Sequence, residues 1–280
     1  MNKPTKRPWA YRRYLLIRGP KHGLPRLLQQ TYTTGKRLRH PDLARLMEHP
    51  PTTQAPLLFY PGCYLYSPTI IRNTLKILDH IGIPYQTLGG LSYCCGLPHR
   101  LQGDTTQADA CTARLAAAII IATPQTIVTS CLECLEALNQ IKTQTNAPYE
   151  VLHTLELIHR HRHKFPDAHA TTPLLIHEPC RLAHSPHLKD TVIALAASLG
   201  QPVILLPSST PSCCHRWNHK DPTTPTHHKK YLATATTYHA SLVCPCLTCL
   251  EAFQKTTPSA PLHDLIDLFA ASLDTKEMTP

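Results

Sequence analysis

Short apolar runs alternate with longer stretches of helical periodicity along most of the chain. Residues 57–60 form an apolar run that stops at Pro61-Gly62, which is typical of a buried strand followed by a turn. Residues 69–81 have the apolar spacing of an amphipathic helix. The predicted strands are 57–60, 83–88, 126–129, 174–177, 203–206 and 242–243, and the predicted helices are 69–81, 104–122, 132–141, 188–199, 223–240 and 247–254.

This alternation of strands and helices predicts an α/β fold with parallel sheets and helical crossovers. The order of elements occurs twice, so we expect two similar Rossmann-like half-domains related by internal duplication. We assign residues 1–55 to a basic N-terminal arm, residues 56–165 to the first half-domain and residues 166–280 to the second. The histidine-rich stretch at 159–164 is interpreted as a hydrated linker or a helix end rather than a metal site.

Ten of the twelve cysteines form one five-cysteine pattern that occurs twice, and each copy ends in Cys-Leu-x-Cys. The first copy consists of Cys63, Cys94, Cys95, Cys131 and Cys134. The second copy consists of Cys180, Cys213, Cys214, Cys246 and Cys249. Thiolates are soft, strong metal ligands. These cysteines follow predicted strands, and open α/β sheets bind ligands at the carboxyl ends of their strands, so each half is expected to hold a metal centre.

The spacing of the cysteines indicates the kind of centre. In Cys131-x-x-Cys134 both sulfurs can face one metal centre at the start of a helix, whose N-terminus favours thiolate. The adjacent Cys94 and Cys95 are easier to accommodate on different irons of a cluster than on one ion. Five candidate ligands also exceed the four of a zinc site or an ordinary cubane cluster. The count argues against a simple zinc site, although zinc stays an alternative.

Composition restricts the cellular setting. With 280 residues and 42% hydrophobic residues, the chain is large enough to bury a substantial core. No apolar run has membrane-spanning length, and the Arg12-Arg13 pair is not followed by the apolar segment of an export signal. We therefore expect a cytoplasmic protein, in which twelve cysteines favour metal binding over disulfides.

The positive charge is concentrated at the N-terminus. Residues 1–50 contain twelve Lys and Arg against two acidic residues, whereas residues 51–280 contain sixteen of each sign. Such a segment is attracted to an acidic partner subunit or to an anionic membrane surface at its inner face, and nucleic acid is not the expected partner. The alternative is a solvated tail without a specific partner, but its apolar residues favour docking. These are Trp9, Tyr11, Tyr14, Leu15, Leu16, Ile17, Leu24, Leu27 and Leu28.

Several motifs together resemble a known family. They are Tyr60-Pro61-Gly62-Cys63, Cys94-Cys95-Gly96-Leu97-Pro98 and Cys131-Leu132-Glu133-Cys134, with His177-Glu178-Pro179-Cys180, Cys213-Cys214 and Cys244-Pro245-Cys246-Leu247-Thr248-Cys249 in the second copy. They resemble the CCG, or cysteine-rich, domain that occurs in heterodisulfide reductase and in related components of glycolate, lactate and glycerol-3-phosphate oxidising systems and some succinate dehydrogenases. The resemblance covers about residues 56–270.

The resemblance implies one or two 4Fe–4S clusters of the non-cubane kind, held by the two five-cysteine sets, in an oxidoreductase subunit. In heterodisulfide reductase the cluster pair cleaves a disulfide. The chain departs from the family at His215, which stands where the motif has glycine, and the second site is therefore expected to differ in geometry or cluster type. The ferredoxin module of longer relatives has no counterpart here, so electrons are expected from a ferredoxin-like iron–sulfur or flavin subunit.

Other residues near the cysteines have weaker assignments. Cys111 and Cys244 fall outside the pattern and are interpreted as structural, with Cys244 a second choice as ligand. His99, His177 and His215 are candidate helpers that donate hydrogen bonds to a cluster or substrate, against coincidental proximity in a chain with 19 histidines. Glu178 is a candidate proton relay or a partner of Arg181.

Two classes of function are therefore predicted. The first is an oxidoreductase subunit that transfers electrons or reduces a disulfide, with quinone-linked transfer or membrane anchoring of a dehydrogenase as its variant. The second is a zinc-stabilised, non-catalytic scaffold whose basic arm recruits a partner. Gly89-Gly90 is not a dinucleotide fingerprint and no phosphate-binding loop is present, so neither flavin nor nicotinamide is expected in this chain.

Overall fold

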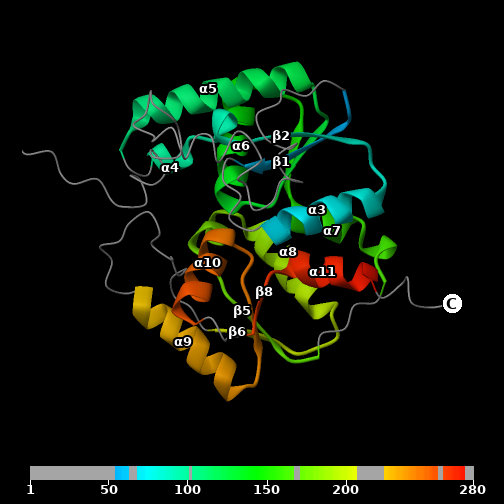
Figure 1. The fold of residues 1–280 in the computed structure, drawn as a ribbon, viewed down its shortest axis with the longest axis vertical. Coiled ribbons are helices and arrows are strands. Elements are labelled where there is room, and N and C mark those ends of the chain that lie inside the picture. The colour runs from blue at the N-terminus through cyan, green and yellow to red at the C-terminus, as the bar shows by residue number, and fades with distance from the viewer. Residues whose placement is uncertain are drawn as a thin grey trace, which may run out of the picture.

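The computed structural model describes residues 54–62, 68–100, 103–166, 171–206, 224–257 and 261–274. Residues 1–53 of the arm, together with Cys63, Cys213, Cys214 and His215, lie outside the described residues. The described chain forms two four-stranded parallel sheets with helices packed around them (Figure 1). This confirms the predicted α/β class with two similar halves.

The first sheet has the strand order β2-β1-β3-β4, and all its pairings are parallel. Its strands are β1 (Leu57–Gly62), β2 (Tyr85–Gly89), β3 (Thr126–Thr129) and β4 (Glu150–His153). The helical segments of this half are α3 (Pro68–Ile81), η3 (Leu91–Tyr93), α4 (Leu97–Arg100), α5 (Thr105–Ala122), α6 (Leu132–Thr145), α7 (Thr154–Arg160) and η4 (Arg162–Lys164).

The second sheet repeats this arrangement with the order β6-β5-β7-β8, again all parallel. Its strands are β5 (Leu174–Ile176), β6 (Val203–Leu205), β7 (Ser241–Val243) and β8 (Leu262–His263). Its helical segments are η5 (Cys180–His184), α8 (Pro186–Ala197), α9 (Thr224–Thr237), α10 (Leu247–Thr256) and α11 (Leu265–Asp274).

Each sheet reverses its direction of growth once, and this reversal positions the candidate sites. From β1 the chain first adds β2 on one side and then returns to add β3 on the other. The carboxyl ends of β1 and β3 therefore flank a topological switch point, where open α/β sheets bind ligands. In the second sheet β5 and β7 flank the equivalent point.

The structure corrects the number of elements predicted from the sequence. Each half was expected to contain three strands, but β4 and β8 add a fourth strand to each sheet. Helices α7 and α11 were also not predicted. The histidine-rich stretch at 159–164 is the end of α7 followed by the short η4 turn, in agreement with the helix-end interpretation.

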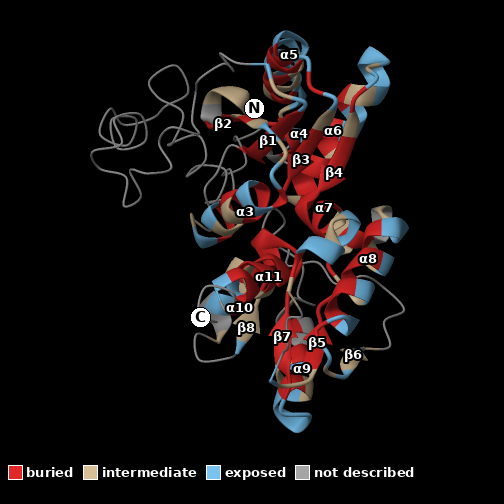
Figure 2. Ribbon diagram, turned by 90° about the vertical axis from the view of Figure 1, so that its right-hand side faces the viewer, coloured by how far each residue is buried: buried red, intermediate tan, exposed pale blue. Residues whose placement is uncertain are grey.

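The two halves contact each other through helices. The helix α11 of the second half packs on α3 of the first half, and α7 packs on α8, in the middle of the molecule (Figure 1). In Figure 2 the central strands β1, β3, β5 and β7 are buried, whereas exposed residues lie on the outer helices such as α5 and α9. The core is therefore continuous across the boundary between the halves.

Candidate metal centres

Four of the five cysteines in the first set come from two separate segments of the first half. Cys94 and Cys95 follow η3, which comes after β2. Cys131 is the N-cap residue of α6 immediately after β3, and Cys134 is in the first turn of this helix. Strand ends and a helix start thus bring thiols from distant positions in the sequence to the switch point of the first sheet.

These four thiols contact one another in a chain of hydrogen bonds. Cys95 bonds to both Cys94 and Cys134, and Cys134 bonds to Cys131. Cys94, Cys95 and Cys134 are buried, whereas Cys131 is half-buried. None of the nine cysteines in the described part of the chain is in a disulfide. The pocket is therefore a reduced cluster of sulfur donors with one edge open to solvent.

The hydrogen bonds between the thiols determine which sulfur ionises first. The thiols of Cys134 and Cys94 bond to Cys95 and lower its pKa to about 6, although burial opposes this shift. The pKa of Cys134 is raised because its thiol hydrogen-bonds to Cys131 and Cys95 in a buried position. At neutral pH the pocket consequently contains a thiolate at Cys95, and a metal that binds there displaces the remaining protons.

Gly62 connects the fifth cysteine of the set to this pocket. It has φ +86°, and a Cβ atom placed on it would lie 3.2 Å from the Sγ atom of Cys134. The amide of Gly90 donates a hydrogen bond of 3.0 Å to the Gly62 carbonyl, which ties this turn to the end of β2. Cys63 itself lies outside the described residues, but the residue before it is in contact with the pocket.

Gly96, the glycine of the Cys-Cys-Gly motif, is tightly packed. It has φ +81°, and an added Cβ would lie 2.5 Å from the carbonyl oxygen of Ala108 on α5. Its amide donates to the Sγ of Cys94 at 3.4 Å. Glycine is needed here for close approach of the loop to α5, and the comparable position in the second half, His215, is outside the described residues. The candidate helper His99 is fully buried on the neighbouring α4.

In the second half, Cys246 and Cys249 have the same relation to α10 as Cys131 and Cys134 have to α6. Cys246 is the N-cap residue of α10, and its thiol is hydrogen-bonded to Cys249, which lowers its pKa. Cys180 is half-buried at the start of η5. The remaining pair of this set, Cys213 and Cys214, is not among the described residues.

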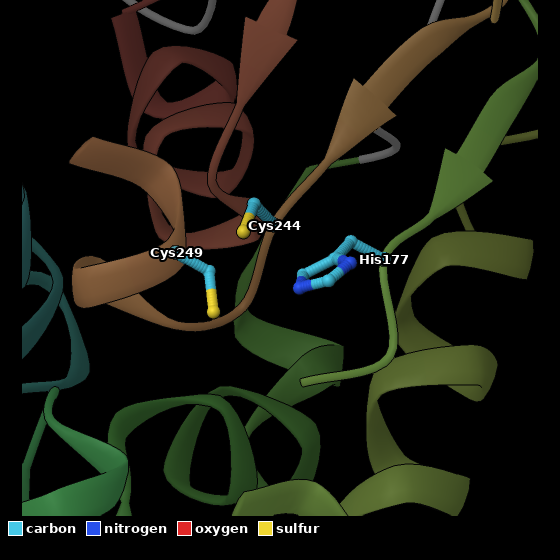
Figure 3. A group of neighbouring side chains, drawn as sticks. All are labelled: His177, Cys244 and Cys249. Atoms are coloured by element: carbon cyan, nitrogen blue, oxygen red, sulfur yellow. The ribbon is translucent and has the colours of Figure 1, made fainter. Parts of the chain in front are cut away.

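The structure also brings together three residues that the sequence pattern did not combine. One ligand atom each from His177, Cys244 and Cys249 lies within 4.8 Å of the other two, and all three residues are buried (Figure 3). Burial raises the pKa of Cys244. The sequence signal for this group was the additional Cys244 at the position of Thr129 in the first copy.

The charged residues near the second set form one ion pair across the two halves and one within the second half. The Nη1 atom of Arg181 donates to Glu136 on α6. The carboxylate of Glu178 accepts a hydrogen bond of 2.7 Å from Lys189. Arg181 was considered as a partner of Glu178 from the sequence, and the structure pairs it with a residue of the other half.

Glu133 lies between the two groups of cysteines. It is the residue before Cys134, it is buried, and its carboxylate accepts a hydrogen bond of 3.4 Å from Thr248, the residue before Cys249. Its charge also acts on Cys246. The starts of α6 and α10 therefore face each other across the boundary between the halves.

Comparison with solved structures finds distant likenesses to amino-acid racemases. Glutamate racemase isoform RacE1 from Bacillus anthracis is 13% identical with a TM-score of 0.39, covering 81% of this chain and 82% of that chain. PH1733, an aspartate racemase homologue from Pyrococcus horikoshii OT3, is 7% identical with a TM-score of 0.37, covering 81% of this chain and 100% of that chain. The aspartate racemase of Picrophilus torridus is 9% identical with a TM-score of 0.37, covering 80% and 94%. No curated protein matches the chain.

Comparison with protein families gives a more specific result. The model of the cysteine-rich domain named CCG matches residues 57–139. This range begins with β1 and ends within α6, so it includes the whole first set of cysteines and the pocket that they form. Residues 57–139 are therefore similar to the cysteine-rich domain named CCG.

Proposed function

We propose that the chain is an iron–sulfur subunit of an oxidoreductase complex and that its first half binds a 4Fe–4S cluster of the non-cubane kind. The ligands would be Cys63, Cys94, Cys95, Cys131 and Cys134. The observation that carries this proposal is the convergence of the four described thiols in one pocket inside the matched domain.

The donor set of the pocket fits such a group. Soft thiolates are the usual ligands of iron–sulfur clusters, and the buried Cys95 already has a lowered pKa. Gly62 keeps a side chain away from the sulfurs, because a Cβ there would approach Cys134, and Gly96 allows the loop that carries Cys94 and Cys95 to pack closely on α5. Five sulfurs also exceed the four that a single tetrahedral ion uses.

The pocket is arranged for exchange with a partner at one edge. Cys131 is the half-buried member of the set. Next to it, a hollow of about 500 Å³ runs along α6 from Leu132 to Gln144 and is bordered by Arg181 and Ser185. When bound, the cluster supplies one-electron redox chemistry. The buried thiols exclude water from its inner side, and the hollow offers a surface where a disulfide substrate or an electron-carrying subunit can bind.

The acceptor is proposed to be a disulfide, with quinone-linked electron transfer within a dehydrogenase as the alternative. Among the described helices, none is both long enough and apolar enough to cross a membrane. The arm at residues 1–55 is proposed to dock on an acidic partner subunit or an anionic membrane surface at the cytoplasmic face, because it carries the excess positive charge of the chain.

Metal analysis of the anaerobically purified full chain tests this proposal. We expect iron and acid-labile sulfide in the wild type, and several-fold less of both in Cys95→Ser, because this thiolate is at the centre of the pocket and metal binding is coupled to folding. Cys111→Ser is the matched control, since Cys111 is equally buried but hydrogen-bonds to Gln107 on α5. Zinc without sulfide in the wild type would instead support the non-catalytic scaffold, and full iron occupancy in Cys95→Ser would refute the ligand assignment.

A further inference from the structure

The second half contains a group of metal-ligating side chains that differs in chemistry from the cysteine pocket of the first half. We infer that His177, Cys244 and Cys249 bind a single tetrahedral metal ion of the Zn²⁺ class, with Cys246 placed to take the fourth position. Imidazole and thiolate together are the ligands that structural zinc sites use. This site is independent of the cluster proposed for the first half.

The strand register shows that two of these ligands are specific to the second half. In the first sheet Phe59 pairs with Val128, and in the second sheet Ile176 pairs with Val243. The residues that follow these pairs are therefore equivalent between the halves: Tyr60 corresponds to His177, and Thr129 corresponds to Cys244.

The first-half equivalents serve other purposes. The hydroxyl of Tyr60 donates to the carbonyl oxygen of Tyr93 at 2.5 Å. The hydroxyl of Thr129 accepts from the amide of Cys131 at 3.4 Å. Neither side chain is a good ligand for zinc, so the first half offers only its patterned cysteines at this place.

The geometry of the three ligands is close to that of a tetrahedral site. Their ligand atoms lie within 4.8 Å of one another, and the imidazole points toward the two sulfurs (Figure 3). Two sulfurs bound at about 2.3 Å to one tetrahedral ion lie about 3.8 Å apart. Side-chain movements of less than about 1 Å would therefore bring the group to bonding distance.

The backbone around the ligands is fixed by the sheet. The amide of His177 donates to the carbonyl of Val243 at 2.8 Å, and the amide of Cys244 donates to the carbonyl of His263 at 2.9 Å. Cys249 is held in the first turn of α10. Ligands on strand ends and a helix start are positioned before the metal arrives, which favours tight binding.

The surroundings of the imidazole are apolar and aromatic. The ring of His177 makes edge contacts with the rings of Tyr231 at 4.8 Å and Phe253 at 5.0 Å. Such a shell orients the ring and excludes water from the site. Cys246 is also buried, and its hydrogen bond to Cys249 puts it beside the group. A closed set of three cysteines and one histidine is typical of a structural rather than a catalytic zinc site.

X-ray absorption at the zinc edge of the anaerobically purified full chain tests the site without any substitution. We expect about one zinc per chain, with sulfur ligands at about 2.3 Å and a nitrogen ligand at about 2.0 Å. Chains in which zinc is replaced by Co²⁺ should show the visible bands of a tetrahedral site and thiolate-to-cobalt charge transfer. Zinc below stoichiometric amounts, or a shell of oxygen ligands only, would overturn the inference.

Two substitutions separate this site from the first-half pocket. In Cys244→Ser, zinc affinity measured by chelator competition should fall by more than about 100-fold, since loss of an outer-shell partner alone costs about 10- to 100-fold. Iron and sulfide should be retained in Cys244→Ser, and zinc should be retained in Cys95→Ser. Unchanged zinc affinity in Cys244→Ser would refute the site, with Cys111→Ser as the control for loss of a buried thiol. If Cys244→Ser does not fold, the wild-type absorption spectrum decides.

Discussion

At the residue scale, His153 shows how burial controls a titrating side chain. It is 1% exposed at the end of β4, and burial lowers its pKa to about 4. Its Nδ1 atom accepts a hydrogen bond of 3.3 Å from the amide of Leu155, and its own amide donates to Glu156. The neutral imidazole thus caps the N-terminus of α7, and protonation would remove the acceptor.

This predicts a loss of stability in acid that depends on His153. An unfolded histidine has a pKa near 6.5, so the unfolded chain binds more protons than the folded chain as the pH falls from about 6.5 to about 4. Between pH 7 and pH 5 the residue should cost about 2 kcal/mol of unfolding free energy. The variant His153→Asn retains a cap acceptor but does not titrate. Its free energy of unfolding, measured with urea, should therefore fall by about 2 kcal/mol less than that of the wild type over the same pH range. Equal losses in both proteins would contradict the assignment.

At the element scale, the loop between η3 and α4 is pressed against α5. Gly96 and Gly103 both have positive φ, at +81° and +77°. An added Cβ at Gly96 would lie 2.5 Å from a backbone oxygen of α5, whereas one at Gly103 would meet nothing within 4 Å. Alanine at Gly103 would therefore introduce backbone strain alone, whereas alanine at Gly96 would introduce backbone strain and a steric clash.

The matched substitutions Gly96→Ala and Gly103→Ala should differ in unfolding free energy. Gly103→Ala should cost about 1–2 kcal/mol, because an L-residue is strained at this φ. Gly96→Ala should cost about 1–3 kcal/mol more, because the backbone of α5 or the loop must also shift. Urea unfolding of both variants measures the difference. If the two costs are the same, the contact between the loop and α5 does not restrict this position.

Strand and helix patterns in the sequence predicted most of the elements, including both strands that flank each switch point. The strands β1, β3, β5 and β7 could be predicted because they are short apolar runs that are buried between layers. The strand β4 contains Glu150 and His153, and β8 has only two residues, so neither produces a clear apolar run. The helix α11 has a regular apolar face in the sequence, and this signal could have been used.

The candidate site was predictable to a similar degree. The order of the cysteines predicted a pocket at strand ends, because the carboxyl ends of parallel strands meet at one edge. The group of His177 with Cys244 and Cys249 could not be predicted with the same certainty. It depends on the register of β5 against β7 and on the direction of each side chain, and neither follows from spacing in the sequence.

At the scale of the whole molecule, polar pairs connect the halves across their helices. Asn73 on α3 donates to Asp267 on α11 at 2.7 Å. Arg181 pairs with Glu136, and their side chains are 19% and 30% exposed. An ion pair at this level of burial is less screened by solvent than one on the open surface.

A double-mutant cycle measures the strength of this connection. We expect a coupling energy of about 1–2 kcal/mol between Arg181→Met and Glu136→Gln in urea unfolding, since the pair is partly buried. The exposed pair Arg100 and Asp109, with side chains 42% and 67% exposed, is the control, and its cycle should give less than about 0.5 kcal/mol. Equal coupling in the two cycles would show that the pair between the halves adds nothing specific.

Deletion of residues 1–50 tests the partner proposal for the arm. The shortened chain should retain its iron and sulfide but bind anionic vesicles or an acidic partner subunit several-fold more weakly, and the difference should shrink as salt is added. Co-sedimentation with anionic and neutral vesicles, and pull-down of the partner, provide the measurement. If the shortened chain binds the vesicles and the partner as strongly as the full chain, the arm does not mediate docking.

The matching positions of Tyr60 with His177 and Thr129 with Cys244 have a functional consequence. If the second half holds the inferred ion, two side-chain differences at matching strand ends distinguish its site from the cysteine pocket of the first half. Such a difference would let the first half carry out redox chemistry while the second half stabilises the fold. The double substitution Tyr60→His and Thr129→Cys would place the same types of zinc ligand at the matching positions of the first half.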